Sequence, residues 1–288
     1  MSFIILEAIK KGGKLVCSVS GGKDGQAMTK SLVVNGFPIH SMVHADLGEV
    51  EWKESLPMCK KQSDEFNIPL VVVRRNDGLG LLEYWQKRMN TLKGTGKPFW
   101  SSSKNRYCTS DLKREPINAY LRKIDGNLIV SCEGIRAEES TARAKKTPLT
   151  IRQGVTSTFY NGMSVEEAIE NYRPDKRLVL TWYPIFNYTL DEVWATYGSW
   201  PVDLECFRCI YKRNGYVSEL WPFHPAYVYG NDRVSCVFCI LGSKNDLLVG
   251  AIQRPELLDK MIEMEEEGNA TFKNNWSLKE LKNKQYEK

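Results

Sequence analysis

The run from Leu15 to Lys30, near the N-terminal end of the sequence, most constrains what this chain can fold into. It consists of LVCSVSGGKDGQAMTK, which is an apolar β-prone stretch, a Ser-Gly-Gly-Lys-Asp turn and the start of a helical pattern. Gly21 and Gly22 can adopt backbone angles that other residues avoid, so successive N–H groups can converge on one anion, and a following helix adds the positive end of its dipole. The order of strand, glycine turn and helix therefore predicts an α/β fold that carries an anion site.

The side chains of this turn suit a phosphate. Lys23 adds a positive charge, and Ser18 and Ser20 add hydroxyl donors. The spacing differs from the G-x-x-x-x-G-K-[ST] pattern of ordinary P-loops, so the usual nucleoside triphosphatase interpretation does not apply. The alternative is a surface glycine turn that binds nothing, and the strand and helix on either side of it argue against that alternative.

β-rich runs alternate with helical patterns through the first two thirds of the chain. This alternation predicts an α/β fold with a doubly wound, mostly parallel sheet. We expect strands at residues 15–20, 39–46, 70–75, 128–132 and 178–184, and helices at residues 25–34, 51–66, 81–92, 111–123 and 165–172. Ligands collect at the carboxyl ends of the strands in such sheets, so Ser20, Asp46 and Gly134 are expected on one rim.

The sequence changes in character near Trp200, where aromatic residues, cysteines and short turns precede a charged helical tail. We therefore expect a nucleotide-binding domain at residues 1–199 and a smaller Cys-rich region at residues 200–288.

The net charge of +5 suits a protein that handles phosphates but is lower than that of proteins with a strongly basic nucleic-acid-binding surface. Because no apolar run approaches the roughly 18 residues that a membrane span needs, we expect a cytoplasmic protein with no membrane partner.

Four of the eight cysteines form two CxxC pairs, Cys206 with Cys209 and Cys236 with Cys239. In a chain without a secretory signal, such pairs indicate metal or cluster binding rather than disulfides. Spacing alone favours a tetrahedral Zn²⁺ held by these four thiolates. Cys17 and Cys132 lie in predicted strands and are expected to be small buried core residues.

Charged residues follow two of the predicted strands. Asp46 ends one strand, where its carboxylate could meet a ribose, an adenine amino group or Mg²⁺, the alternative being an ordinary turn aspartate. Arg136 and Arg143 flank two carboxylates after another strand, and guanidinium groups bind phosphate or sulfate bidentately. We expect these arginines to form a second anion grip, the alternative being a solvated charged helix start.

Together, these segments resemble the superfamily of PAPS reductase-like proteins and PP-loop ATP pyrophosphatases, also described as adenine nucleotide α hydrolase-like. The glycine turn is similar to the SGGxDS loop of that superfamily, with Gly25 where the pattern has Ser. Four further segments occur in the family's order, namely HADLGEVEW from His44, YCTSDLKREP from Tyr107, GIRAEESTAR from Gly134 and HPAYVYGNDRVSCVFCILGS from His224. The resemblance spans residues 15–243 and is closest to phage and mobile-element members.

The resemblance implies binding of ATP, or of PAPS, together with Mg²⁺. The implied nucleotide-binding residues are Ser18, Ser20, Gly21, Gly22, Lys23, Asp24, Gly25, Asp46, Gly134 and Arg136, and the implied catalytic residues are Lys23, Asp24, Arg136 and Arg143. In the iron–sulfur members, a mid-chain cysteine joins a C-terminal CxxC pair around a [4Fe–4S] cluster, and Cys108, Cys236 and Cys239 match those places. Either Cys206 or Cys209 would supply a fourth ligand, or one iron would stay open. This match favours the cluster over zinc.

Thiol-dependent PAPS reductases share a C-terminal ECGxH motif, whereas no cysteine follows Cys239 in this sequence. We therefore expect the other chemistry of the superfamily, in which ATP is split between its α and β phosphates, an oxygen is adenylated and sulfur displaces AMP. The expected partners are a nucleic-acid or nucleotide acceptor and a sulfur donor or complex partner protein. The alternatives are an APS or PAPS reductase variant that takes its nucleophile from a partner, and a non-catalytic nucleotide-sensing subunit of a phage or defence complex.

Overall fold

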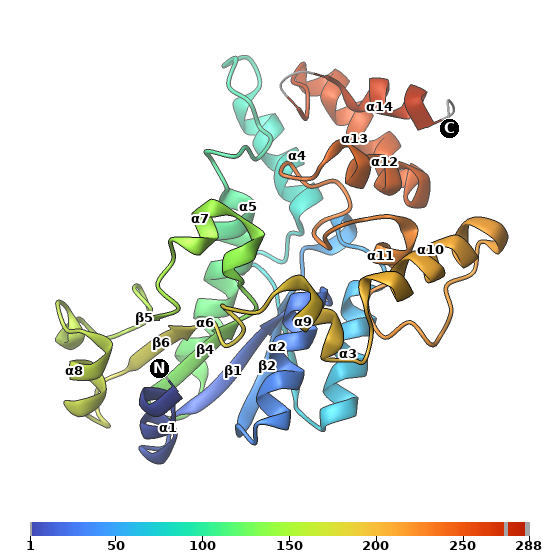
Figure 1. Ribbon diagram of the computed structural model, residues 1–288. Coiled ribbons are helices and arrows are strands. Elements are labelled where there is room, and N and C mark those ends of the chain that lie inside the picture. The colour runs from blue at the N-terminus through green and yellow to red at the C-terminus, as the bar shows by residue number, and fades with distance from the viewer. Residues whose placement is uncertain (1, 274–275, 286–288) are drawn as a thin grey trace. The chain divides into compact units, whose positions relative to one another are not determined.

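The computed structural model describes residues 2–273 and 276–285 (Figure 1). The contacts within the chain divide it into two compact units, each assembled from several segments. The first unit consists of Met1–His44, Leu56–Val73 and Ile117–Leu204, and the second consists of Ala45–Ser55, Arg74–Pro116 and Glu205–Lys288. The domain limits of 1–199 and 200–288 stay a prediction, to which the packing adds two earlier segments that join the C-terminal unit.

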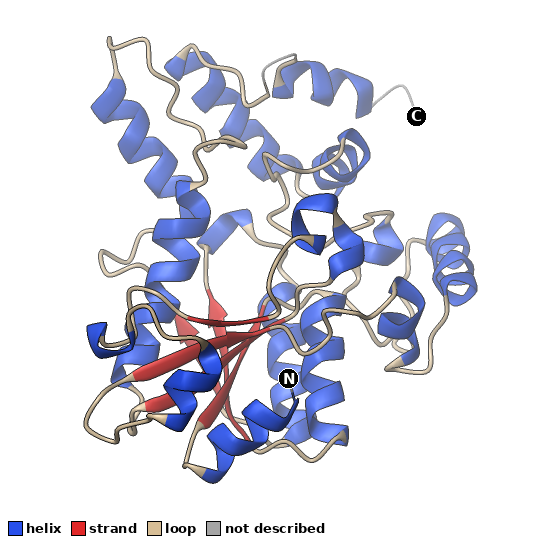
Figure 2. Cartoon of the chain, turned by 60° about the vertical axis from the view of Figure 1, so that its left-hand side comes forward, coloured by secondary structure: helices blue, strands red, loops and turns tan. Residues whose placement is uncertain are grey.

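The first unit contains a six-stranded sheet with the order β3-β2-β1-β4-β6-β5 (Figure 2). The strands are β1 (Lys14–Val19), β2 (Ile39–Ala45), β3 (Leu70–Val73), β4 (Leu128–Glu133), β5 (Leu149–Ile151) and β6 (Leu178–Trp182). The central strand β1 pairs in parallel with β2 and β4, and β4 pairs in parallel with β6, whereas β5 is antiparallel to β6. The predicted α/β fold with a mostly parallel sheet is confirmed, and the three-residue β5 is the strand that the sequence analysis missed.

Apolar side chains cover both faces of this sheet, because successive residues of a strand point to opposite faces. On one face, Leu15 and Cys17 of β1 belong to a core cluster with Met28 of α2 (Lys23–Val34). On the other face, Val16 of β1 packs with Leu121 of α6 (Glu115–Lys123). Burying an aliphatic side chain of this size contributes about 1.5–3 kcal/mol, so both layers of helices are held on the sheet.

The other helices of the first unit are short. They are α1 (Ser2–Lys10), α3 (Ser55–Phe66), α7 (Thr141–Ala144), α8 (Val165–Glu170) and α9 (Leu190–Ala195). Both α8 and α9 begin with a capping box, in which Ser164 pairs with Glu167 and Thr189 with Glu192. These boxes fix where the two helices begin.

The second unit is built from helices and connecting turns. It contains α4 (Leu81–Leu92), α5 (Tyr107–Thr109), a π-helical turn (Ser110–Arg114), α11 (Ala226–Tyr229), α12 (Lys244–Gln253), α13 (Pro255–Gly268) and α14 (Leu278–Gln285), while α10 (Pro201–Asn214) begins in the first unit. Its core includes an aromatic cluster in which the ring of Trp100 lies 5.0 Å from that of Trp85 and 5.2 Å from that of Phe272. Across the described ranges, no helix combines the length and apolar character that a membrane span requires.

Candidate functional site

The glycine turn lies between β1 and α2, as the sequence predicts. Gly21 has a φ of +75°, a conformation that suits glycine, and Gly22 is the extended N-cap of α2. The N-cap has no side chain to accept the first N–H groups of this 12-residue helix. The turn is therefore built to present backbone N–H groups and the positive end of a helix dipole to an anion.

Ser18 and Ser20 differ in their surroundings. Ser20 is exposed at the turn, whereas the hydroxyl of Ser18 is buried and has no hydrogen-bond partner among the described residues. A buried hydroxyl without a partner costs free energy in the empty protein, so it fits a donor that a ligand satisfies. The structure thus brings the serines, glycines and Lys23 of the predicted phosphate loop together.

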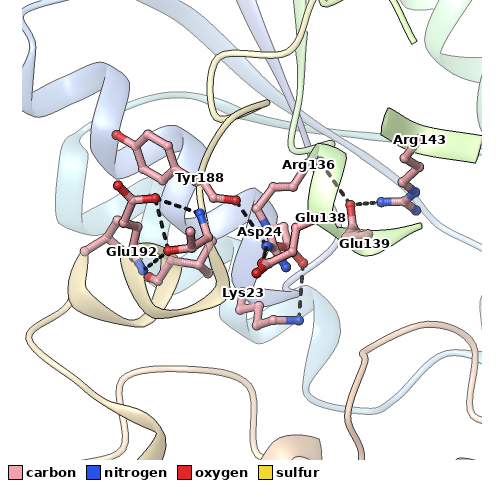
Figure 3. A network of polar contacts seen from close by, with 11 residues as sticks. Lys23, Asp24, Arg136, Glu138, Glu139, Arg143, Tyr188 and Glu192 are labelled. Atoms are coloured by element: carbon pink, nitrogen blue, oxygen red, sulfur yellow. Dashed lines mark hydrogen bonds and ion pairs between the residues drawn. The ribbon is translucent and has the colours of Figure 1, made fainter. Parts of the chain in front are cut away.

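The first two residues of α2 take part in a buried network of charges (Figure 3). Lys23 is only 6% exposed, and its Nζ lies 3.4 Å from Oδ2 of Asp24 and 5.7 Å from the centre of the Trp194 ring. The Oδ1 atom of Asp24 accepts a hydrogen bond of 2.6 Å from Nε of Arg136. Asp24 therefore holds two cations beside the phosphate loop.

Arg136 is 3% exposed and is surrounded by acceptors. Besides Asp24, its Nη1 donates to Glu138 at 2.6 Å and to the carbonyl of Tyr188 at 3.2 Å. Burial alone would lower the pKa of this guanidinium, but the charge of Asp24 and the hydrogen bonds to Asp24 and Glu138 outweigh burial and raise it. Arg136 therefore stays charged and aligns Asp24.

Arg143 does not share these contacts. It pairs with Glu139, whose carboxylate also accepts the backbone N–H of Arg136, and its side chain is about one third exposed. Figure 3 shows this second pair next to the Asp24–Arg136 contact, linked to it by the hydrogen bond from the Arg136 backbone to Glu139. The two arginines thus form two ion pairs with protein carboxylates, and a second anion grip made by both stays a prediction.

Two glycines at the phosphate loop differ in the space around them. A Cβ atom on Gly134 would lie 2.7 Å from the carbonyl oxygen of Asp24, so only glycine allows the end of β4 to come this close to α2. A Cβ atom on Gly25 would meet nothing nearer than 3.7 Å. The site therefore has room for the first atom of the serine that the loop pattern has at this position.

Asp46 belongs to the second unit, directly after β2 in the chain. Its Oδ1 accepts the N–H of Gly48 at 2.7 Å, and its Oδ2 accepts from Nη2 of Arg74 at 2.5 Å. Both oxygens thus have partners within the second unit, as expected for a turn aspartate. Its contact with a nucleotide or Mg²⁺ stays a prediction.

Three of the predicted metal-ligand cysteines affect the charge of one lysine in the second unit. Burial alone would lower the pKa of Lys113, but the charges of Cys236, Glu51, Cys239 and Cys108 together raise it. Burial raises the pKa of Cys236 to about 12, while the charge of Lys113 acts in the opposite direction. The π-helical turn that follows Cys108 carries Lys113, and π turns are often found at functional sites.

The other two cysteines, Cys206 and Cys209, are exposed on α10. In the described part of the chain, no three His, Cys, Asp or Glu side chains form a group that could hold a metal ion, so the predicted set of four CxxC thiolates is not assembled. The ammonium of Lys113 instead interacts electrostatically with the other three cysteines. The side chains in this arrangement do not fit a cluster or a zinc ion, and we derive no step through either.

Sequence reasoning missed the parts played by Glu51, Trp194 and Tyr188. Tyr188 contributes a backbone carbonyl, which leaves no signal in the side-chain pattern.

The imidazole of His224 is satisfied locally, since its Nδ1 accepts the N–H of Ala226 at 3.0 Å. Burial lowers its pKa to about 3, so it is neutral at physiological pH.

The model of the phosphoadenosine phosphosulfate reductase domain matches residues 14–199. The chain belongs to this family. No curated protein matches the sequence. The matched range covers the sheet, the phosphate loop and the Asp24–Arg136 contact, and it also contains Cys108 and Lys113.

Solved structures similar to this PAPS reductase family member are distant in sequence. A phosphoadenylyl-sulfate reductase from Candida auris is 11% identical, with 81% of this chain and 86% of that chain covered and a TM-score of 0.47. An FMN adenylyltransferase from Candida glabrata is 13% identical, with 64% of this chain and 48% of that chain covered and a TM-score of 0.33. At such similarity, the family match is the finding that bears on function.

Proposed function

We propose that this protein is an ATP-using PP-loop enzyme that adenylates an oxygen of its substrate and then lets sulfur displace AMP. The observation that carries the proposal is the loop between β1 and α2, where Gly21 has a positive φ and α2 begins with Lys23 beside Asp24. Such a loop binds phosphates without supplying a nucleophile. The chemistry must therefore come from the bound nucleotide and from groups elsewhere in the chain.

In the first step, an oxygen of the acceptor attacks the α phosphorus of MgATP. An O–P bond forms, the bond from the α phosphorus to the bridging oxygen breaks, and pyrophosphate leaves with the electron pair. Backbone N–H groups of the loop and the ammonium of Lys23 stabilise the charge that develops on the leaving phosphates. Asp24 and Arg136 act as positioning residues, because their contact fixes the first turn of α2.

In the second step, the partly buried thiols of Cys108, Cys236 and Cys239 carry the sulfur. A persulfide donor passes one sulfur to a cysteine and leaves as a thiol. The terminal sulfur attacks the carbon that carries the adenylated oxygen, the C–O bond breaks and AMP leaves. A second cysteine then attacks the mixed disulfide and frees the thiolated product, while an external dithiol reduces the remaining protein disulfide. The charge of Lys113 lowers the pKa of Cys236 and so opposes the larger effect of burial, which raises it.

The sequence pattern favours an iron–sulfur cluster on Cys108, Cys236 and Cys239, with zinc as its rival, whereas the described side chains form no group that could hold either. Absorption spectra and metal analysis of anaerobically purified protein distinguish these forms from a metal-free thiol cluster. Bound iron and sulfide would support the cluster. Bound zinc alone would support the rival, and protein without metal would support the thiol chemistry described above.

Product analysis tests the proposed activity. Purified protein is incubated under anaerobic conditions with ATP labelled at the α phosphate, a persulfide donor and either single-stranded DNA, transfer RNA or no acceptor. We expect AMP and pyrophosphate in equal amounts, formed only when an acceptor is present. Sulfite released from PAPS would instead favour a reductase, and binding of nucleotide without turnover of ATP or PAPS would favour a sensing subunit.

A further inference from the structure

A pocket of about 340 Å³ lies in the second unit, apart from every residue assigned above to nucleotide binding. Its walls include Ser102, Ser103, Asn105, Ile240, Lys273 and Trp276. We refer to it as the Trp276 pocket. Its volume is in the range of ordinary small-molecule sites and is sufficient for a nucleoside.

The wall that carries Trp276 is held by a buried carboxylate. Glu265 of α13 accepts the N–H of Phe272 at 2.5 Å with one oxygen and the N–H of Leu278 at 2.7 Å with the other. These two bonds hold Phe272, next to Lys273, and Leu278, two residues after Trp276. Lys273 and Trp276 also form an antiparallel bridge with each other. Contacts within the protein thus hold Lys273 and Trp276 in place, which lowers the entropic cost of binding.

Another part of the pocket lining is a turn closed by its own hydrogen bonds. The N–H of Ser102 donates to the carbonyl of Asn105 at 3.0 Å, and the N–H of Asn105 donates to the hydroxyl of Ser102 at 2.9 Å. The hydroxyl of Ser103 and the amide of Asn105 are exposed at the pocket. They offer donors and acceptors in the same pocket as the partly exposed Trp276.

The chain around this turn is positively charged. Residues 93–106 contain four basic residues, Lys93, Lys97, Lys104 and Arg106, and no acidic residue. An aromatic ring, hydrogen-bonding side chains and flanking cations are the features that recognise a nucleobase with its phosphates, since the base stacks on the ring and the phosphates meet the cations.

The pocket lining includes Ile240, the residue after the partly buried Cys239. Lys273 donates to the carbonyls of Ile240 at 2.5 Å and Gly242 at 3.1 Å, which fixes the chain directly after Cys239. Its ammonium also interacts with the Cys239 thiol. A ligand in the pocket is therefore held beside the group to which we assign sulfur transfer.

We propose that the Trp276 pocket binds the base of the sulfur acceptor, either an unpaired base of a nucleic-acid strand or the base of a free nucleotide. The assignment of this base as acceptor rests on the proposed function. Binding itself is measured without ATP, so the two can fail independently.

Fluorescence anisotropy of a labelled single-stranded ten-nucleotide oligonucleotide tests the pocket. We expect Trp276→Ala to weaken binding about tenfold or more and Trp276→Phe to retain most of it, because phenylalanine keeps a stacking face. Trp200→Ala, which removes an exposed tryptophan of the first unit, is the matched control and should bind as the wild type does. Ser103→Trp fills the pocket from an exposed position and should also abolish binding, which guards against a folding defect in the alanine variant.

Competition with nucleoside monophosphates separates the two sources of the base. Displacement of the oligonucleotide by micromolar monophosphate supports a free nucleotide, and displacement only by other strands supports a nucleic acid. Equal affinity of the wild type, Trp276→Ala and Ser103→Trp for oligonucleotide and monophosphate alike would overturn the pocket assignment. If the oligonucleotide binds as expected and no pyrophosphate forms from ATP, the pocket stands and the proposed function fails.

Discussion

The Nε atom of Arg136 lies 2.6 Å from Oδ1 of Asp24, which joins the segment after β4 to the first turn of the helix that follows the phosphate loop. Gly134 makes this approach possible, since any Cβ atom there would collide with the backbone of Asp24. The phosphate loop is thus fixed at two places. It follows β1 directly in the chain, and the Asp24–Arg136 ion pair joins it to the segment after β4. Substitutions in this ion pair should therefore alter nucleotide binding indirectly, through the position of the loop.

Arg136→Lys should lower both stability and affinity for ATP, although it keeps the charge. Lysine cannot reproduce the separate bonds that Arg136 makes to Asp24, Glu138 and Tyr188. Loss of a charged hydrogen bond at a mostly buried site costs about 1.5–3 kcal/mol. Urea unfolding measures the change in stability, and calorimetric titration with ATP measures the change in affinity. The control is Arg143→Lys, because its more exposed pair with Glu139 should contribute about 1 kcal/mol or less. Similar effects of the two variants would contradict the positioning role of Arg136.

Lys23→Ala should weaken ATP binding by about 1.5–3 kcal/mol, because it removes a charge-assisted contact to phosphate. Lys30, in the same helix, provides the control. Its ammonium lies 3.9 Å from the centre of the Tyr197 ring, and Lys30→Ala should leave ATP affinity unchanged. Unchanged affinity of Lys23→Ala for both ATP and PAPS would exclude Lys23 from the phosphate site.

Gly25→Ser should strengthen ATP binding. The nearest heavy atom to a Cβ at this position is 3.7 Å away, so serine fits and adds a hydroxyl to the loop. One further hydrogen bond contributes about 0.5–1.5 kcal/mol. Gly25→Ala is the control, since it gains helix stability of up to about 1 kcal/mol but no hydroxyl. An alanine variant that binds ATP as tightly as the serine variant would show that the hydroxyl makes no contact.

The arrangement of strands and the phosphate loop could be predicted because each signal is local. Alternating apolar runs determine β1, β2 and β4, and the glycine turn identifies the anion site directly. The antiparallel β5 escaped prediction because three residues carry too short a pattern. The predicted helix at 51–66 begins later, at Ser55, because residues 48–50 form a separate 3₁₀ turn.

The partners of the charged residues could not be predicted, because they depend on contacts between segments far apart in the chain. Arg136 suggested an anion grip from composition, whereas the fold supplies Asp24 from 112 residues away as its partner. The electrostatic interaction of Lys113 with Glu51 and with Cys108, Cys236 and Cys239 likewise depends on packing between distant segments. The CxxC spacing made both cysteine pairs equal candidates for metal ligands. Spacing alone does not show that Cys206 and Cys209 are exposed whereas Cys236 and Cys239 are partly buried.

Cys108→Ser should abolish sulfur transfer, whereas the double variant Cys206→Ser/Cys209→Ser should retain it. Cys108, like Cys236 and Cys239, interacts electrostatically with the ammonium of Lys113. The two cysteines of α10 are exposed instead. The measurement is the amount of thiolated product per AMP released. Loss of product in the double variant, with Cys108→Ser active, would move the sulfur chemistry to α10.

His224 should make the protein less stable as the pH falls through the range below 6.5. Burial lowers the pKa of its imidazole from 6.5 to about 3, so between these values the unfolded chain binds a proton that the folded chain does not. The free energy of unfolding therefore rises with pH across this window and falls on acidification. Between pH 6.5 and pH 5, this one group should account for a loss of about 1.5 kcal/mol.

Urea unfolding of the wild type and of His224→Gln at pH 5.0, 5.5, 6.0 and 6.5 measures this loss. The variant should be less stable at pH 6.5, because it disturbs the hydrogen bond from Ala226 N–H to the imidazole and the contact with Ser55. Its stability should nevertheless depend less steeply on pH, so the difference between the two proteins narrows toward pH 5. Parallel pH profiles would mean that His224 is protonated to the same extent in the folded and unfolded chains, which would contradict its burial as a neutral imidazole.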